Sequence, residues 1–275
     1  MADAPSACAA LVRRVDFDRY LAALFAPAEA RERLFALYAF NHEIAKVRET
    51  VSEPMIGQIR LQWWREALDG IYAGTPRKHA VAEALAAAVA AAPPQRADFE
   101  ALIDAREFDL AGRAPATLAE LEGYCEGTSG RLLRLAAALL GADPEREQAA
   151  LADAGAAWAL TGLVRAIPFH ARARRRYIPD DVAAEAGLGE EALFALQPGA
   201  ALGRAARQLA AAAERRLDRL RPAGGRARPL MLFAPLARAY LRRLARRNHD
   251  VLGPPIEIGA ARKIVLLWWA ARRAG

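Results

Sequence analysis

The stretch LFALYAFNHEIAKVRETV, residues 34–51, decides how the rest of the chain is interpreted. Its apolar residues recur at alternating spacings of three and four: Leu37, Phe40, Ile44, Val47 and Val51. This spacing predicts one long helix that is buried along one side. Residues four apart lie on the same face of a helix, so we expect Ala45 and Glu49 to face the same space.

Outside this stretch the chain of 275 residues is rich in alanine and poor in β-branched runs, which favours an all-helical protein. No internal repeat or linker divides it, so we expect a single domain over residues 1–275 with a short N-terminal tail, residues 1–15. The helix after Pro54 is expected to bury a stripe of five residues: Ile56, Ile59, Trp63, Ala67 and Ile71. Further helices are expected at about 16–26, 80–92, 96–112, 117–141, 143–165, 182–196, 200–220, 229–247 and 259–273.

Three local signals mark helix ends and irregularities. Thr117 and Glu120 have the spacing of a capping box, which opens a helix. The segment Gly127–Gly130 places two glycines inside a helical pattern, which indicates a kink or a close backbone approach. Pro168 is expected to break or bend the preceding helix.

Positive charge is concentrated near the C-terminus. Residues 1–220 hold 27 Lys and Arg against 30 Asp and Glu, whereas residues 221–275 hold 12 against 2. A basic segment on a near-neutral body favours an anionic partner surface, either phospholipid or nucleic acid. Nucleic acid is disfavoured because no helix-turn-helix or aromatic sheet signature accompanies the basic residues.

The C-terminal segment 263–273 has an apolar centre with two tryptophans and basic flanks, which is typical of contact with an anionic membrane surface. Its rival interpretation is a closing helix packed on the body of the protein. The run Ile264–Ala271 is too short to span a bilayer. Two distant cysteines and the absence of a secretory signal favour a reducing compartment. We therefore expect a cytoplasmic protein, peripheral to the inner face of the cytoplasmic membrane.

Several short motifs resemble the squalene/phytoene synthase family in order and spacing. They are Tyr38-Ala39-Phe40, Tyr124 with Gly130, Leu163-Val164-Arg165, and Arg176-Tyr177-Ile178-Pro179, and the resemblance covers about residues 17–265. It implies the all-α isoprenoid synthase fold, a helical barrel around a central apolar cavity. Members of that family join two prenyl diphosphates head to head.

The chain departs from the family at the two aspartate motifs that hold Mg²⁺ there. Mg²⁺ prefers carboxylate oxygens and bridges to the departing diphosphate. The first motif's positions hold Ala45, Lys46 and Glu49, and the second motif's positions hold Ala166 and His170. One carboxylate stands where four are needed, so we expect a protein that has lost the synthase chemistry and has no cofactor. Mg²⁺ is expected only if the chain is an active transferase.

A narrower resemblance accounts better for these substitutions. Residues 39–53, 56–72 and 164–179 are similar to those members of the superfamily that serve as mitochondrial assembly factors of respiratory complex I. This implies a bacterial relative with an accessory role, complex I subunits or assembly proteins as partners, and a prenyl or other lipid as a ligand of the retained cavity. Two alternatives stay open: an active head-to-head prenyl-diphosphate transferase and a lipid carrier.

The candidate ligand-binding residues are Tyr38, His42, Glu49, Arg165, His170, Arg176 and Tyr177. Glu49 is either a surviving ligand carboxylate or the partner of a nearby Lys or Arg. His42 and His170 either meet across the cavity mouth or are separate, satisfied histidines. Arg176, within the run Arg172–Arg176, either holds a phosphate or belongs to a solvated face. Arg165 either binds a ligand or forms a salt bridge with Glu49 or Asp109.

Overall fold

The computed structural model describes residues 5–51 and 53–273, which fold into helices without any strand. The α-helices are α1 Ala7–Val15, α2 Phe17–Ala23, α3 Ala28–Ala45, α4 Pro54–Tyr72, α5 Ala80–Ala91, α6 Arg96–Glu107, α7 Leu118–Cys125, α8 Arg131–Leu139, α9 Gln148–Arg165, α10 Ile167–Arg172, α11 Asp180–Ala186, α12 Glu190–Phe194, α13 Ala200–Arg219, α14 Phe233–Ala245 and α15 Ala260–Arg273. Four shorter segments are η1 Val47–Glu49, η2 Phe108–Leu110 and η4 Gly225–Leu232, which are 3-10, and the π segment η3 Glu126–Gly130. The expected all-helical class is confirmed.

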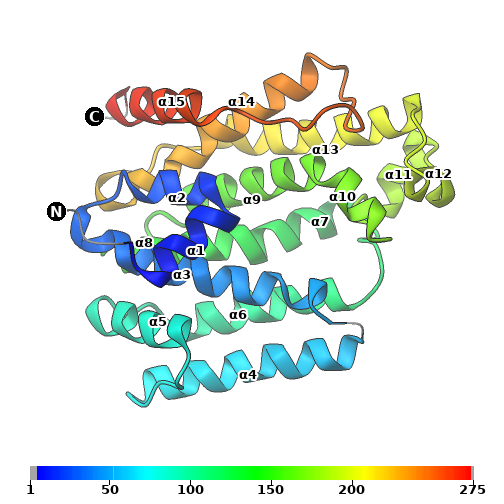
Figure 1. Ribbon diagram of the computed structural model, residues 1–275. Coiled ribbons are helices and arrows are strands. Elements are labelled where there is room, and N and C mark those ends of the chain that lie inside the picture. Colours follow the sequence, from blue (N-terminus) through cyan, green and yellow to red (C-terminus); the bar gives the residue numbers. More distant parts are fainter. Residues whose placement is uncertain (1–4, 52, 274–275) are drawn as a thin grey trace.

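The helices are arranged around α9, which runs through the middle of the molecule (Figure 1). It packs against α13, α14, α8 and the π segment η3. Helix α4 lies at one edge of the view and α15 at the opposite edge, while α3 leads from the side of the N-terminus toward α10. The C-terminal end of α3 and the start of α10 therefore lie at one end of the helical barrel.

Trp158, in the middle of α9, connects the separate parts of the core. It packs against three clusters of buried apolar side chains, formed mainly by the first half of the chain, by the second half, and by α2 with α15. Its ring lies 5.3 Å from the ring of Phe233 and 6.2 Å from that of Tyr240. An indole at this position fills space between the two halves of the barrel.

The helix predicted over residues 34–51 ends earlier than expected. Helix α3 ends at Ala45, and a 3-10 turn follows at Val47–Glu49. The Thr50 hydroxyl donates to the Val47 carbonyl at 3.0 Å, and Arg175 Nη2 donates to the Arg48 carbonyl at 3.1 Å. In this turn the Glu49 amide donates to the Lys46 carbonyl at 2.9 Å, three residues back, so Ala45 and Glu49 do not stand on successive turns of one α-helix.

Other predictions need correction. Residues 7–15 of the expected tail form α1, which buries Cys8, Ala9 and Val12, because its apolar face packs on α3. On α4, Ile56 and Ile59 are exposed, since α4 turns Leu61, Trp64 and Leu68 toward the core instead. The expected helix at 182–196 is divided at Gly187, which ends α11 with a left-handed backbone at φ 64°.

Two local predictions are confirmed. The Thr117 hydroxyl accepts from the Glu120 amide at 3.1 Å and so opens α7. The glycine segment forms the π segment η3, and Gly130 lies against Gly155 of α9 so closely that a Cβ on Gly155 would stand 2.4 Å from the Gly130 Cα. Close packing of two backbones explains why glycine is used at this crossing.

Candidate functional site

The positions of the two aspartate motifs lie at the end of α3 and at the start of α10. Lys46 caps α3, and its Nζ lies 2.5 Å from Glu43 Oε1. Glu49 is exposed, and within the described part of the chain no Lys or Arg nitrogen lies within 4.0 Å of its carboxylate, so the expected basic partner of Glu49 is wrong. Ala45 and Ala166 present only methyl groups, which cannot ligate a cation.

These residues do not fit Mg²⁺. Among residues 5–51 and 53–273, no group of three or more His, Cys, Asp or Glu side chains is placed to hold a metal ion. At the motif positions themselves Glu49 supplies one carboxylate, whereas Mg²⁺ needs several oxygen ligands.

His170 lies in the last turn of α10 and is half-buried. Its ring lies 4.6 Å from the ring of Tyr177, and its buried Nδ1 meets no hydrogen-bond partner among the described residues. Burial, together with the nearby Arg175 guanidinium, lowers the pKa of His170 to about 4. His42 stands on α3 beside Lys46 and Glu43, where partial burial and Lys46 lower its pKa. Within the described residues, His42 and His170 form no hydrogen bond or ring contact with each other.

A half-buried hydrogen-bond network is centred on Asp109 at this end of the barrel. Asp109 Oδ1 accepts from the Tyr177 hydroxyl at 2.6 Å and from the Tyr124 hydroxyl at 2.8 Å. Arg106 Nη1 lies 3.3 Å from Asp109 Oδ2 and donates to the Tyr124 oxygen at 2.9 Å. Burial and the Asp109 charge raise the pKa of Tyr177 far above its ordinary value. The four side chains join η2, α6, α7 and the loop before α11.

The sequence motifs indicate Tyr177 and Tyr124 but not that the two share a hydrogen-bond acceptor. The expectation for Asp109 is a salt bridge with Arg165, and no motif points to Arg106. The signal was present in part, because Arg106 and Asp109 are three apart and so can pair at the end of one helix. Nothing in the spacing indicates that Tyr124 and Tyr177, which lie in distant segments, share one acceptor.

The part of the basic run that follows α10 lines a cavity of about 320 Å³ together with Arg48; it comprises Arg174, Arg175 and Arg176. Arg176 Nη2 lies 2.7 Å from Asp180 Oδ1, and its Nη1 lies 3.9 Å from Glu190 Oε2, so the structure pairs Arg176 with carboxylates. The Arg174 guanidinium lies 4.8 Å from the centre of the Phe194 ring. Arg175 holds the Arg48 carbonyl. The run therefore fastens η1 and α12 to this end of the barrel.

Arg165 occupies a different environment from the one expected. Its guanidinium lies 3.7 Å from the centre of the Tyr240 ring, its Nε donates to the Ile256 carbonyl at 3.2 Å, and its Nη2 lies 3.1 Å from Glu257 Oε1. The predicted salt bridge to Glu49 or Asp109 is wrong. The carboxylate that pairs with Arg165 is Glu257, which lies in the segment between α14 and α15.

Tyr38 is buried on α3 and faces a cationic group in the interior. The Arg19 guanidinium lies 5.9 Å from the centres of both the Tyr38 and the Phe233 rings. Arg19 pairs with Asp16 and lies 3.4 Å from Ser129 Oγ, while its buried Nε meets no acceptor among the described residues. Burial raises the pKa of Tyr38, so its hydroxyl stays protonated. Tyr38 and Arg19 thus form a polar group among buried apolar side chains of the core.

Replacing Tyr177 by Phe tests the network. The change removes one hydrogen bond to a buried carboxylate, and we expect the free energy of unfolding to fall by about 1.5 kcal/mol. Urea denaturation followed by circular dichroism measures this change. Tyr20→Phe is the matched control, because the Tyr20 hydroxyl has no hydrogen bond within the described residues, and it should change stability by less than about 0.5 kcal/mol. Equal effects of both variants would contradict the role assigned to Asp109.

The buried state of His170 predicts a pH dependence of stability. Since its pKa in the folded protein is lowered to about 4 from 6.5, the unfolded chain binds a proton first as the pH falls. Stability contributed by neutral His170 is complete above about pH 6.5 and should fall by about 2 kcal/mol on going to about pH 5. Urea denaturation at several pH values measures the slope. His170→Gln should remove this part of the pH dependence, and an unchanged slope would contradict the assignment.

Comparison with known proteins identifies a family and several relatives of this chain. The model of the squalene/phytoene synthase family matches residues 12–266. The chain is 36% identical over 184 residues to NADH dehydrogenase (ubiquinone) complex I, assembly factor 6, of Bos taurus; this match covers 67% of the chain and 55% of that protein. The protein of the same name from Rattus norvegicus is 30% identical over 254 residues, covering 91% of the chain and 76% of that protein. In the first match the chain spans about half the length of its relative.

The solved structures give the same fold. A dehydrosqualene synthase in complex with a ligand superimposes with a TM-score of 0.84 at 20% sequence identity, covering 97% of this chain and 94% of that one. The expected isoprenoid-synthase-like architecture is therefore confirmed. The narrower sequence resemblance to complex I assembly factors is confirmed as well.

Proposed function

Because the chain belongs to the squalene/phytoene synthase family, we propose that it is a non-catalytic member of that family and serves as an accessory or assembly factor for respiratory complex I. The observation that carries the proposal is the composition of the barrel mouth. Methyl groups stand at Ala45 and Ala166, and Lys46 is paired with Glu43. A diphosphate leaving group needs several carboxylate-bound cations at these positions.

The hydrogen bonds at this end of the barrel also support the proposal. The hydrogen-bonded network of Asp109, Tyr124 and Tyr177 lies beside the ring of His170, which stands at one of the motif positions. Such a network stabilises the end of the barrel as a fixed surface. We propose that this surface contacts complex I subunits or other assembly proteins, and that the interior around Tyr38 and Arg19 holds a prenyl or other lipid.

Deletion of the gene tests the assembly role. Membranes of the deletion strain would be compared with wild type by native gel electrophoresis and by NADH oxidation. We expect a loss of assembled complex I that the wild-type gene restores. Glu49→Ala should restore it equally well, because no metal role is assigned to that carboxylate. Unchanged complex I in the deletion strain would overturn the proposal.

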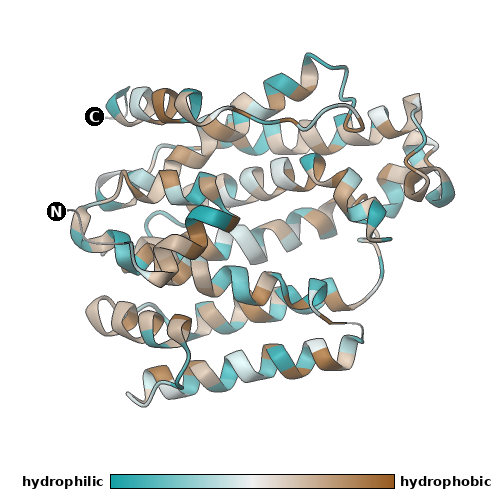
Figure 2. Ribbon diagram, viewed as in Figure 1, coloured by the Kyte–Doolittle hydropathy of each residue, from teal (hydrophilic) through white to brown (hydrophobic). Residues whose placement is uncertain are grey.

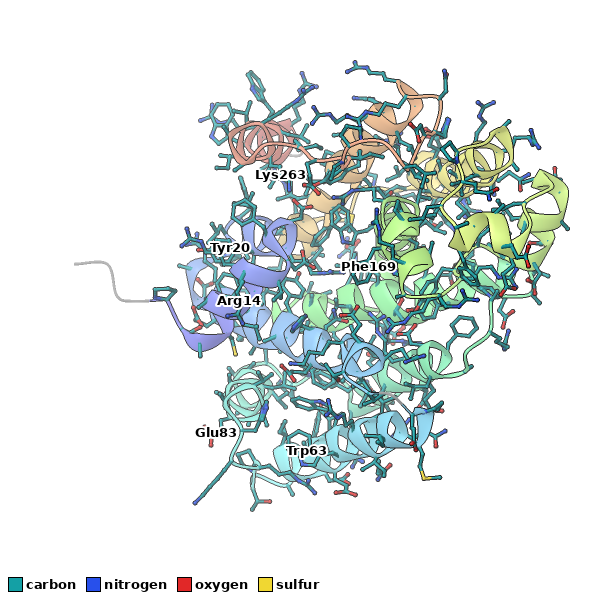
Figure 3. All side chains as sticks on the ribbon, turned by 45° about the vertical axis from the view of Figure 1, so that its right-hand side comes forward. Arg14, Tyr20, Trp63, Glu83, Phe169 and Lys263 are labelled. Atoms are coloured by element: carbon teal, nitrogen blue, oxygen red, sulfur yellow. The ribbon has the colours of Figure 1, made fainter. Side chains whose placement is uncertain are left out.

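The alternative function is head-to-head transfer between prenyl diphosphates, and the close fold match to a dehydrosqualene synthase is the observation that favours it. Purified protein would be incubated with farnesyl or geranylgeranyl diphosphate and Mg²⁺ or Mn²⁺ while pyrophosphate is measured. We expect no sustained turnover. Turnover that is lost in Glu49→Ala but kept in Glu83→Ala, a carboxylate on the distant helix α5 (Figure 3), would establish the alternative.

We also propose a location at the inner face of the cytoplasmic membrane. None of the described helices is both long and apolar enough to cross a bilayer. The support for a peripheral position is the surface of α15, which exposes Ile264, Val265, Trp268 and Trp269. Tryptophan and flanking arginine side chains favour the interface between lipid and water.

A further inference from the structure

A groove with a volume of about 800 Å³ lies at the end of the barrel where α3 begins. Figure 1 shows this end, with the start of α3, η4 and α15, opposite the end that carries η1 and α10. The groove is therefore separate from the mouth that holds the aspartate-motif positions. Its volume is that of sites that hold small molecules.

The lining of the groove is apolar with a basic edge. The apolar surface comes from the corner between α2 and α3, from η4, from the first turn of α14 and from the last turns of α15, and it includes Phe25, Met231, Leu232, Pro235 and Ala271. Three arginines and no acidic residue line the same groove: Arg31, Arg226 and Arg228. A ligand that fits this surface combines a long apolar part with an anionic group.

The three arginines keep most of their hydrogen-bond donors available. Arg31 Nε donates to the Ala26 carbonyl at 3.1 Å, Arg226 Nη1 donates to the Leu140 carbonyl at 3.3 Å, and Arg228 Nη2 donates to the Ala271 carbonyl. Across residues 5–51 and 53–273, no carboxylate oxygen lies within 4.0 Å of any of these guanidinium groups. A guanidinium offers five donors, so each can still bind phosphate oxygens.

The start of α3 adds to the positive potential. Pro27, at the N-cap of this 18-residue helix, has no side-chain acceptor for the free amides of the first turn. Pro27 and Ala28 both line the groove. The N-terminal end of a helix favours an anion, and here it faces the same space as the arginines.

The outer face of α15 continues from the groove. Only Lys263 and Leu267 of this helix are buried, whereas Trp268 and Trp269 are 41% and 53% exposed. Figure 2 shows apolar residues in the middle of α15 between hydrophilic ends. The Arg272 guanidinium lies 3.8 Å from the centre of the Trp268 ring. Groove and helix thus form one surface that is suited to a lipid bilayer.

We propose that this groove binds one anionic phospholipid of the membrane on which α15 rests. An acyl chain occupies the apolar surface, and the phosphate lies at Arg31, Arg226 and Arg228. This inference deepens the proposed peripheral location and rests on it. Charge complementarity selects a phospholipid with a net negative headgroup over a zwitterionic one.

Purified full-length protein would be mixed with vesicles of phosphatidylcholine alone or with added phosphatidylglycerol, and with single lipids in detergent for native mass spectrometry. We expect one bound phosphatidylglycerol per chain and little phosphatidylcholine. The triple variant Arg31→Gln, Arg226→Gln, Arg228→Gln should weaken phosphatidylglycerol binding at least about tenfold. The matched control removes the same charge from the opposite edge of the molecule with Arg60→Gln, Arg77→Gln and Arg96→Gln, and it should bind as wild type.

A second variant distinguishes lipid binding in the groove from electrostatic attraction of the whole protein to the vesicle surface. Ala28→Trp fills the groove without changing charge, and it should abolish the one-to-one lipid adduct while vesicle flotation persists. Equal binding of both lipids, equal loss in the two triple variants, or an intact adduct in Ala28→Trp would each overturn the proposal. These measurements use isolated protein, so their failure is distinct from unchanged complex I in the deletion strain.

Discussion

Lys263→Met should destabilise the protein by about 3–5 kcal/mol, because it leaves a buried carboxylate without its cation. Lys263 Nζ lies 2.6 Å from Asp18 Oδ1, and the Tyr240 hydroxyl donates to Asp18 Oδ2 at 2.8 Å. Burial alone lowers the pKa of Lys263, but hydrogen bonds to Asp18 and Tyr240 raise it overall. Figure 3 shows Lys263 directed from α15 toward the body of the molecule. Urea denaturation measures the loss of stability.

Two further variants control this experiment. Asp18→Asn combined with Lys263→Met removes both charges and keeps an acceptor for Tyr240, so it should recover most of the lost stability. Lys78→Met removes an exposed lysine and should change stability by less than about 0.5 kcal/mol. A single Lys263→Met variant as stable as wild type would contradict the role of the ion pair.

The loss of the Lys263–Asp18 ion pair should also affect membrane contact, because this pair holds α15 against the body of the protein. Only Lys263 and Leu267 are buried among the described residues of α15, so the helix has few other anchors. Arg228, which also lines the groove, holds the Ala271 carbonyl at the far end of the same helix. Lys263→Met should therefore expose α15 to protease before the rest of the protein unfolds.

Gly155→Ala should reduce stability by about 3 kcal/mol, since it inserts a methyl group between two backbones. The added Cβ would lie 2.4 Å from the Gly130 Cα and 2.6 Å from the Ser129 carbonyl carbon, and neither backbone atom can rotate away. Helix α9 carries the contacts to α13, α14 and η3, so a shift at this crossing disturbs both halves of the core. Thermal and urea denaturation both measure the effect.

Gly162 provides the matched control on the same helix. A Cβ there meets nothing within 4 Å, so Gly162→Ala should stabilise the protein by about 0.5–1 kcal/mol through a better helix propensity. Opposite signs for the two substitutions would verify that α9 and η3 are in backbone contact. A loss of stability in both variants would instead indicate a general intolerance of alanine in α9.

The sequence alone predicted a kink or a close backbone approach at Gly127–Gly130, but it did not indicate the partner of that approach. Gly155 is one small residue in an alanine-rich helix, and no local pattern marks it as the contact point. The same limit applies to the network at the barrel mouth. Tyr177 stood out in a motif, whereas its acceptor Asp109 lies 68 residues earlier in the chain and meets it only through folding.

The helical class, most helix positions, the family and the substituted aspartate motifs follow from the sequence, because each depends on residue identity and short-range spacing. Tertiary structure decided that α3 ends at Ala45, where a 3-10 turn follows and Arg175 of a distant segment holds the Arg48 carbonyl. It also decided that Arg165 pairs with Glu257, that Lys263 is buried against Asp18, and that three arginines surround an apolar groove. Such contacts join residues far apart in the chain, and their free energies depend on burial and distance, which local sequence patterns do not record.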